Sequence, residues 1–531
     1  MSSFSPELLE QIEELLNVGI ALSAEKDFHR LLEMILTEAQ RITNADAGTL
    51  YIKENDQLVF AIVHNETLGI SQGGRGEPTG LPPVVITPEP ENVCAYAAVT
   101  RQIVNIPDVY ASDRFDFTGP RRYDAITGYH TQSMLVLPLC NYDDEVIGVL
   151  QLINAKDGAR VVPFAPHLEK IIASLASQAA VSLTNMQYIA EINRLFDSFV
   201  QAIAAAIDAR TPYNVNHTRN VALLAGRLAN YIDRLSTGPW AAERFGENRT
   251  EQLVKAAWLH DIGKVAIPLE VMDKPTRLAG RLELVLQRLD YIALQLEFAC
   301  CREANRETRE RLQEELVLAR AGRDLVARLD RPETFVDDLA RAALQELACR
   351  KYWDGLGVES PWLTPQELEC LSIARGTLTG AERRVMESHV AVTERMLQKI
   401  AFNKRLRHVP TWAVLHHELL DGSGYTRGLA GDDIPLEARL LTVLDVYDAL
   451  TASDRPYKRA MPAERALDIL RAMAAEGKLD SALVEVFRKS RVWCDPPDHR
   501  DGFAVCKYTE NTSSRQTAPV GDRTSRDGVN R

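Results

Sequence analysis

The sequence lacks any run of about 18 apolar residues, which is the length that a helix needs to span a bilayer. Its first residues also lack the basic and then apolar pattern of a secretory signal peptide. Eight cysteines are scattered over the 531 residues, and only Cys300 and Cys301 are adjacent, which predicts reduced thiols rather than a disulfide framework. We therefore expect a cytoplasmic protein without a membrane span.

Basic residues are also fewer than acidic residues. The chain has 61 Lys and Arg residues against 74 Asp and Glu residues, which gives a net charge of -13. An acidic chain of this kind is not expected to bind a nucleic acid polymer, although a local basic pocket for a small phosphate compound is compatible with it. The length and the hydrophobic content of 46% predict a globular protein of about two to four domains.

The apolar spacing changes from helical to strand-like early in the chain. It is helical between Leu8 and Leu22, so residues 1–26 are expected to hold an N-terminal helix, and it is helical again from Phe28 to Ile42. Strand-like runs follow, and turn-forming residues separate the members of each pair. The expected strands cover residues 47–52, 58–63, 133–139 and 146–154. This order of elements predicts an α+β domain.

Residues 27–185 resemble a GAF sensor domain, chiefly in the strand of residues 133–139 and the strand Gly148–Leu152. The resemblance implies an antiparallel sheet with flanking helices. Cyclic-nucleotide-binding GAF domains carry an Asn-Lys…Phe…Asp-Glu signature, which this chain matches only in part. The matching residues are Asn154, Lys156, Phe164 and Glu169, with Ala155 splitting the first pair and Leu168 at the Asp position. A small-molecule ligand and a purely dimerising role both remain open for this domain.

A long helical stretch from His167 to Ile207 follows the sensor domain. Its apolar residues recur at threes and fours, which favours a parallel two-stranded seam. They are Ile189, Ile192, Phe196, Phe199, Ile203 and Ile207. We expect residues 186–207 to be a signalling linker and the protein to be a homodimer through the GAF domain and this helix. The alternative is one amphipathic helix packed on its own domain.

His260 and Asp261 end an apolar helical segment, where they offer an imidazole and a carboxylate to one small volume. Asp261 has two carboxylate oxygens and can bridge two metal ions. Imidazole and carboxylate ligands without cysteine suit Fe, Mn, Co, Ni or Zn. Several such ligands with a bridging carboxylate suggest a two-metal site that activates water and neutralises a phosphate. The further candidates are His217, His389, His416, His417 and Asp445.

Residues 195–490 resemble an HD-GYP domain, the all-α subclass of HD phosphohydrolases that cleaves the bacterial second messenger cyclic di-GMP. The matching stretches are Asn216–Arg219, His260–Lys264, Lys274–Pro275, Leu378–Thr379, His389, His416–Glu418, Asp421–Tyr425, Ile434–Arg439, Asp445–Thr451 and Arg455–Lys458. The resemblance implies metal ligation by seven residues, with Asp261 bridging, and linear pGpG as the product, with further cleavage to GMP left open. These ligands are His217, His260, Asp261, His389, His416, His417 and Asp445.

The resemblance also implies roles around the metals. Lys264 would neutralise a non-bridging phosphate oxygen or assist the nucleophile, and the alternative is a cation that caps a helix end. Arg455 and Lys458 match positions that hold the substrate phosphates, and a salt bridge to a nearby aspartate is the alternative for Arg455. Gly424 and Tyr425 are expected at the substrate.

The chain departs from the family pattern in three places. Thr426 stands where the name motif has proline, and residues 279–375 are an insertion that is predicted to be a solvated helical hairpin, with a lid or partner-binding arm as the alternative. Some members bind a third metal through a glutamate four residues before the first histidine, where this chain has Tyr213. We therefore expect two divalent ions, Fe or Mn first and Zn, Co or Ni as alternatives. Residues 491–531 are polar and expected to be disordered.

The predicted function is metal-dependent hydrolysis of cyclic di-GMP under the control of the GAF domain. One alternative is a non-catalytic module that binds a cyclic dinucleotide or docks onto a diguanylate cyclase. The other is an HD hydrolase that acts on another cyclic dinucleotide. The complete set of seven ligands favours an enzyme, while the GAF ligand and the direction of regulation do not follow from the residues.

Overall fold

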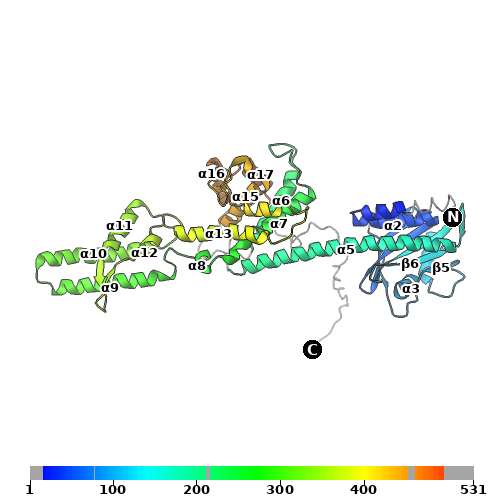
Figure 1. The fold of residues 1–531 in the computed structure, drawn as a ribbon, viewed down its shortest axis with the longest axis horizontal. Coiled ribbons are helices and arrows are strands. Elements are labelled where there is room, and N and C mark those ends of the chain that lie inside the picture. Colours follow the sequence, from blue (N-terminus) through cyan, green and yellow to red (C-terminus); the bar gives the residue numbers. More distant parts are fainter. Residues whose placement is uncertain (1–15, 77, 211–215, 453–460, 495–531) are drawn as a thin grey trace, which may run out of the picture. The chain divides into compact units, whose positions relative to one another are not determined.

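The computed structural model describes residues 16–76, 78–210, 216–452 and 461–494 (Figure 1). The chain divides into two compact units, Met1–Phe196 and Asp197–Arg531, and the boundary falls within one helix. Residues 16–24 are helical, and the rest of the predicted N-terminal helix lies outside the described residues, as do Tyr213, Arg455, Lys458 and the tail beyond residue 494. None of the helices in the described residues combines the length and the apolar character that a bilayer crossing requires.

The first unit is built on an antiparallel sheet in the order β3-β2-β1-β7-β6-β5, with β4 paired to β2 and β8 paired to β7. The strands are β1 (Ala45–Glu54), β2 (Gln57–Asn65), β3 (Ile70–Gly73), β4 (Val84–Val85), β5 (Val104–Ile106), β6 (Met134–Cys140), β7 (Val146–Asp157) and β8 (Arg160–Val162). Three of the predicted strands fall within β1, β2 and β7, and the predicted strand of residues 133–139 matches β6 with a shift of one residue. The predicted α+β class is confirmed.

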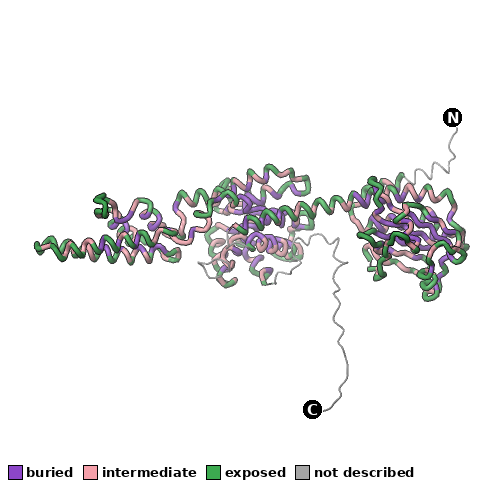
Figure 2. The backbone as a smooth tube through the Cα atoms, turned by 90° about the horizontal axis from the view of Figure 1, so that it is seen from below, coloured by how far each residue is buried: buried purple, intermediate pink, exposed green. Residues whose placement is uncertain are grey.

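Helices cover both faces of this sheet because its strands are apolar on both sides. Along β6, Leu135 and Leu137 point to one core and Met134 and Val136 to the other, as the two-residue period of a strand requires. The first core lies against α2 (Phe28–Thr43) and the start of α5, and the second lies against α3 (Val93–Thr100). A shorter helix, α4 (Thr118–Thr127), completes the unit. Figure 2 shows buried residues gathered in the interior of this unit and exposed residues around them.

Helix α5 runs without a break over Pro166–Asp208, which confirms the predicted helix of residues 167–207. Several of its predicted seam residues are exposed in the part of the chain that the structure describes. Ile189, Ile192 and Phe199 are 60%, 64% and 60% exposed. The interpretation of this segment as an amphipathic helix buried on its own domain does not hold for these side chains.

The second unit carries a compact set of helices, which confirms the predicted all-α class. They are α6 (His217–Asp233), α7 (Gly246–Leu259), η1 (Ile262–Ala266), α8 (Leu269–Met272), α13 (Gly380–Leu397), α14 (Val409–Val414), η3 (Gly431–Asp433), α15 (Leu436–Thr451), α16 (Ala463–Ala475) and α17 (Ser481–Ser490). Helix α6 packs against α7 and α15, α7 packs against α14, and α13 packs against η1. These contacts gather the segments that bear the predicted ligands.

The predicted insertion is helical but is more than a solvated hairpin, because it has a hydrophobic core of its own that includes Val285, Leu289, Val326 and Trp362. Its elements are η2 (Ala279–Arg281), α9 (Leu282–Arg302), α10 (Arg306–Leu329), α11 (Asp338–Cys349), β9 (Lys351–Trp353), β10 (Glu359–Pro361) and α12 (Pro365–Leu371). Helices α9 and α10 lie side by side, joined by a short loop (Figure 1). We call residues 279–375 the arm.

Buried basic residues tie the two ends of the arm together. Arg277 is fully buried, and its guanidinium donates to the carbonyls of Arg331, Thr334 and Ile373 at 2.6, 2.6 and 3.0 Å. Lys274 Nζ lies 2.8 Å from a carboxylate oxygen of Glu382 on α13. The chain therefore returns to its starting point after the arm, as expected if the segments on either side belong to one motif.

Candidate metal centre

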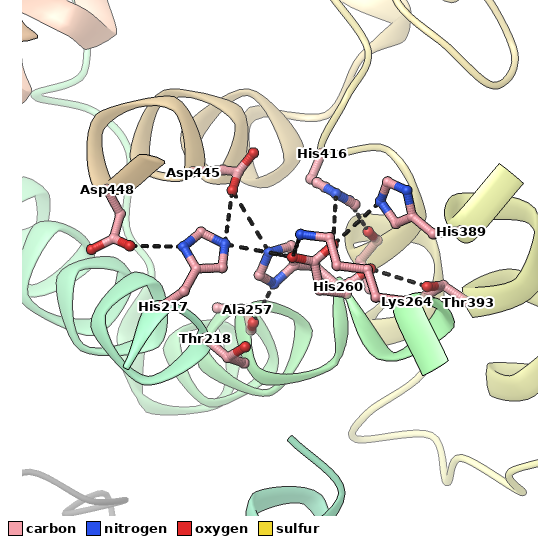
Figure 3. A network of polar contacts seen from close by, with 12 residues as sticks. His217, Thr218, Ala257, His260, Lys264, His389, Thr393, His416, Asp445 and Asp448 are labelled. Carbon is pink, nitrogen blue, oxygen red and sulfur yellow. Dashed lines mark hydrogen bonds and ion pairs between the residues drawn. The ribbon is translucent and has the colours of Figure 1, made fainter. Parts of the chain in front are cut away.

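Five separate segments of the second unit bring all seven predicted ligands close together. Figure 3 labels five of them, which are His217, His260, His389, His416 and Asp445. His217 opens α6, His260 ends α7 with Asp261 directly after it, and His389 lies within α13. His416 and His417 occupy the turn after α14, and Asp445 lies on α15. The site is thus assembled from residues that are up to 228 positions apart, from His217 to Asp445.

Three of these residues form a first group. Ligand atoms of His217, His260 and Asp445 all lie within 4.8 Å of one another. Asp445 Oδ1 is 3.1 Å from His217 Nε2 and 3.8 Å from His260 Nε2. Two imidazole nitrogens and a carboxylate oxygen therefore converge on one point, which is a donor set that first-row divalent metals accept.

A second group consists of His389, His416 and His417, whose ligand atoms also lie within 4.8 Å of one another. The ring centroids of His416 and His417 are 4.0 Å apart, and those of His389 and His417 are 5.2 Å apart. Three imidazoles at this spacing can share one cation.

Asp261 lies between the two groups, and each of its carboxylate oxygens faces a different one. Asp261 Oδ2 is 3.5 Å from His217 Nε2 and 3.2 Å from His260 Nε2. Asp261 Oδ1 is 3.2 Å from His389 Nε2 and 3.9 Å from His416 Nε2. This position would allow Asp261 to contact two cations at once.

The other ring nitrogens of the histidines fix which tautomer enters the site. The Nδ1 atoms of His260, His389 and His416 lie 2.6, 2.7 and 2.6 Å from backbone carbonyls three residues earlier in the chain. A carbonyl can only accept, so each Nδ1 carries the proton and each Nε2 presents a lone pair. These histidines are held ready to bind a cation through Nε2.

The polar atoms at the centre of the site have no protein partners that would satisfy them. His260 Nε2, His389 Nε2, His416 Nε2 and Asp261 Oδ1 are buried without a hydrogen-bond partner among the described residues. Buried polar atoms are rarely left in this state. Divalent metal ions would satisfy all four atoms, so the residues present fit a metal centre.

The surroundings set the charge states that metal binding needs at His416, His417 and Asp445. At His217 burial alone would lower the pKa, but the hydrogen bonds with three carboxylates outweigh it and raise this pKa well above its usual value, so a metal ion would have to displace the proton on Nε2. Burial lowers the pKa of His416 well below its usual value and that of His417 to about 4, so both are neutral near pH 7. Burial alone would raise the pKa of Asp445, but the hydrogen bond from His217 outweighs it and holds this pKa well below its usual value. Neutral imidazoles and ionised carboxylates are the forms that bind metal ions.

Lys264 and Tyr425 border the centre. Lys264 Nζ is 2.5 Å from Asp261 Oδ2, so its positive charge lies beside this carboxylate. The ring of Tyr425 lies 4.7 Å from that of His417, and burial raises the Tyr425 pKa, which keeps the phenol neutral. Gly424 is closely packed, because a Cβ at this position would lie 2.4 Å from Leu419 N and 2.5 Å from His417 O. It allows two stretches of backbone to approach each other.

The partial GAF signature is engaged in bonds within its own domain. Lys156 pairs with Asp46, and the side chain of Asn154 donates to the carbonyl of His130 at 2.7 Å. Glu169 accepts from Asn105 at 2.7 Å, and Phe164 belongs to the core. These contacts give the four residues structural roles.

Sequence reasoning missed Asp448 as a partner of the site. Its Oδ2 lies 2.7 Å from His217 Nδ1, on the opposite side of the imidazole ring from Asp445 (Figure 3), so it orients this histidine. Asp448 follows Asp445 by three residues on α15, and residues at this spacing share a helix face. That spacing is the signal that could have revealed it.

Replacing Asp448 with Ala is expected to lower the metal affinity of the protein by about 10–100-fold, because carboxylates that hold a ligand histidine have effects of this size. Asp448→Asn keeps an oxygen that can accept from His217 Nδ1 and should retain more of the affinity. The measurement is metal retention against a competing chelator. An unchanged affinity in Asp448→Ala would show that His217 needs no such support.

Comparisons with known proteins assign both parts of the chain to known domain types. A GAF domain model matches residues 27–183, and two HD domain models match residues 214–321 and 313–483. A 3'3'-cGAMP-specific phosphodiesterase 3 of Vibrio cholerae is 46% identical over 95 residues, which are 18% of this chain and 20% of that protein. A cyclic di-GMP phosphodiesterase response regulator of Xanthomonas campestris is 32% identical over 188 residues, which are 32% of this chain and 48% of that protein. The matches thus span less than half of either relative.

Among solved structures, the GAF domain of an Acinetobacter phosphoenolpyruvate-protein phosphotransferase matches with 17% identity and a TM-score of 0.27. The match covers 35% of this chain and 98% of that one.

Proposed function

We propose that this chain, which combines a GAF domain with an HD domain, is a metal-dependent phosphodiesterase that hydrolyses cyclic di-GMP to linear pGpG. The observation that carries the proposal is the position of Asp261, with one carboxylate oxygen toward each group of histidines. The Xanthomonas relative, described as a cyclic di-GMP phosphodiesterase, supports the substrate.

The proposal divides the ligands between two divalent cations, of which Fe and Mn are the first choices. When bound, two such cations activate a water molecule and neutralise the charge on the phosphate. Asp261 would belong to both sites, His217, His260 and Asp445 to one, and His389, His416 and His417 to the other.

The chain's own residues complete the chemistry. Lys264, which is held beside Asp261, offers a positive charge to a non-bridging phosphate oxygen. Tyr425 stays neutral and places an aromatic face and a hydroxyl at the border of the site. Arg455 and Lys458, outside the described residues, would hold the second phosphate of the cyclic dinucleotide.

A second candidate substrate is 3'3'-cGAMP, because the Vibrio relative is described as specific for it. Both compounds share the phosphodiester that the site would cleave, so only a direct comparison separates them. Metal-loaded protein should be incubated anaerobically with cyclic di-GMP, 3'3'-cGAMP and cyclic di-AMP, and the products separated. We expect the highest kcat/KM for cyclic di-GMP. A higher value for 3'3'-cGAMP would reassign the substrate, and binding without cleavage would favour a docking module.

Replacing Arg455 with Ala is expected to raise KM for cyclic di-GMP by about 10-fold or more and to leave the metal content unchanged, because a charge-assisted contact to phosphate is lost. Arg471→Ala is a matched control, since Arg471 lies on the surface of α16. Loss of metal with an unchanged KM would contradict a role for Arg455 in substrate binding.

We also propose that the GAF domain controls the site through α5. Just beyond the end of α5, Arg210 donates to the carbonyls of Lys264 and Ile267 at 2.8 and 3.1 Å. Asp208 accepts from Thr218 at 3.2 Å, next to His217. The end of the helix is therefore tied to two segments that bear site residues, and a rotation or shift of α5 would reach both.

An insertion near Asn193 that shifts the seam of α5 by half a turn is expected to change the basal rate of hydrolysis. An insertion of one full heptad keeps the seam in phase and is the matched control. The rates of both variants and their response to candidate GAF ligands are compared with the unmodified protein. If the out-of-phase variant matches the control in both respects, α5 is only a tether.

A further inference from the structure

Helix α9 of the arm is apolar on two opposite faces. Its inner face, with Val285, Leu289 and Ile292, is buried in the core of the arm. Its outer face carries large apolar side chains that the rest of the described chain leaves wholly or partly exposed. These are Leu284, Tyr291, Leu294 and Phe298, with 61%, 37%, 64% and 60% of their surface exposed.

The outer residues follow a heptad repeat. Leu284, Tyr291 and Phe298 are seven residues apart and take the a positions, and Leu294 takes a d position. The remaining d positions hold Gln287 and Cys301, which are also exposed. A stripe of a and d residues along a helix is the pattern of a two-stranded coiled coil. An ordinary solvent-facing helix would carry polar residues there.

The hairpin of β9 and β10 extends this apolar stripe. The side chain of Gln295 donates to the carbonyl of Trp353 at 2.9 Å and to the hydroxyl of Tyr291 at 2.8 Å, which holds the hairpin against α9. Trp353 and Leu356 are 61% and 90% exposed. A continuous exposed patch of this kind marks an interaction surface.

The charges that flank the stripe select the partner. The g positions are acidic, and the e positions are basic or neutral. The g residues are Glu283, Asp290 and Glu297, and the e residues are Arg288, Gln295 and Arg302. In a parallel pair each g residue faces the e residue of the next heptad on the other helix. Acidic residues would then face Arg288, Gln295 and Arg302 of a second copy, whereas an antiparallel pair would place acidic residues opposite one another.

Of these three pairs of facing positions, Glu297 with Arg302 is the most accessible. Glu297 pairs with Arg320 of α10 at 2.9 Å but keeps 54% of its side chain exposed. Arg302 is exposed at the end of α9, where its guanidinium lies over the ring of Phe298. Arg288 is less available, because it is held by Glu367 at 2.7 Å.

We propose that α9 pairs in parallel with α9 of a second copy of this chain, so that the arm is a self-association device. The apolar stripe supplies the attraction, and the flanking charges set the direction. This pairing is independent of the catalytic proposal and of the predicted seam on α5.

Cys301 provides a specific test, because d residues of a parallel coiled coil lie opposite their own copies. The full chain is treated with a short bismaleimide cross-linker, and the linked residues are identified by mass spectrometry. We expect a covalent dimer joined through Cys301. It should persist in Cys300→Ser and disappear in Cys301→Ser. Antiparallel pairing, or contact with a different protein, would leave Cys301 unlinked to itself and would overturn the proposal.

Substitutions on the stripe distinguish specific pairing of two α9 helices from cross-linking by random collision. Leu294→Glu buries an unpaired charge at the interface and should lower the Cys301 cross-link yield at least about tenfold. Leu339→Glu, on the exposed face of α11, is the matched control and should leave it unchanged. Glu297→Arg and Arg302→Glu should each lower the yield, and the double variant should restore it. An unchanged cross-link yield in Leu294→Glu would contradict parallel pairing, and so would a double variant in which the yield stays low.

Discussion

Replacing Asp261 with Ala is expected to abolish phosphodiester hydrolysis, with a fall in kcat of at least about a thousandfold. The carboxylate faces His217 and His260 with one oxygen and His389 and His416 with the other. Its removal takes a ligand from both groups at once, and metal ions in such sites contribute several kcal/mol to transition-state stabilisation. The measurement is kcat together with metal content per chain.

Two controls make this prediction specific. Asp324→Ala alters an aspartate of the arm whose side chain is 85% exposed, and it should behave as the unmodified protein does. The Asp261→Ala variant should keep its helical circular dichroism, since α6, α7, α13 and α15 also pack through apolar contacts. Turnover at the normal rate in folded Asp261→Ala protein would remove Asp261 from the mechanism.

Gly263→Ala is expected to destabilise the second unit by about 3 kcal/mol or more and to remove most of the activity. A Cβ at this position would lie 1.9 Å from His389 O and 2.6 Å from Thr393 N. These are backbone atoms of α13, so the helix that carries His389 would have to move, and overpacking of this kind is costly. The measurement is the denaturation midpoint together with kcat.

Gly280→Ala is the matched control, because nothing lies within 4 Å of its added Cβ. In the unmodified protein, Thr393 of α13 joins this helix to η1 and to the residue before it. Gly263 N donates to the Thr393 hydroxyl at 2.9 Å, and this hydroxyl donates to His260 O at 3.1 Å. If Gly263→Ala and Gly280→Ala have the same midpoint and the same kcat, η1 and α13 are not coupled as closely as these distances indicate.

Much of the fold could be predicted because its signals are local. The alternation of Leu135 and Leu137 with Met134 and Val136 is visible in the sequence, and it places β6 between two helical layers. The ligand set could be predicted because the family resemblance covers residues that are far apart in the chain. Spacing alone would not have brought His217 to Asp445.

The parts that were missed depend on contacts across long separations. The sequence around Arg277 does not indicate that its guanidinium donates to the carbonyl of Ile373, which lies 96 residues further along the chain at the other end of the arm. The arm was predicted as a solvated hairpin because the Glu and Arg content of α10 hides the buried Ala319, Gly322 and Val326. The packing role of Gly424 was also missed, since only the folded backbone reveals its close approach to His417 and Leu419.

A metal titration of the metal-free protein tests the central claim most directly. Mn(II), or Fe(II) under anaerobic conditions, is added in steps, and bound metal and cyclic di-GMP hydrolysis are measured on the same samples. Hydrolysis should rise with occupancy and reach its plateau at two metal ions per chain, because Asp261 joins two ligand groups and Tyr213 is a poor substitute for a third carboxylate. Protein that holds two metal ions per chain and cleaves no cyclic dinucleotide would contradict the account.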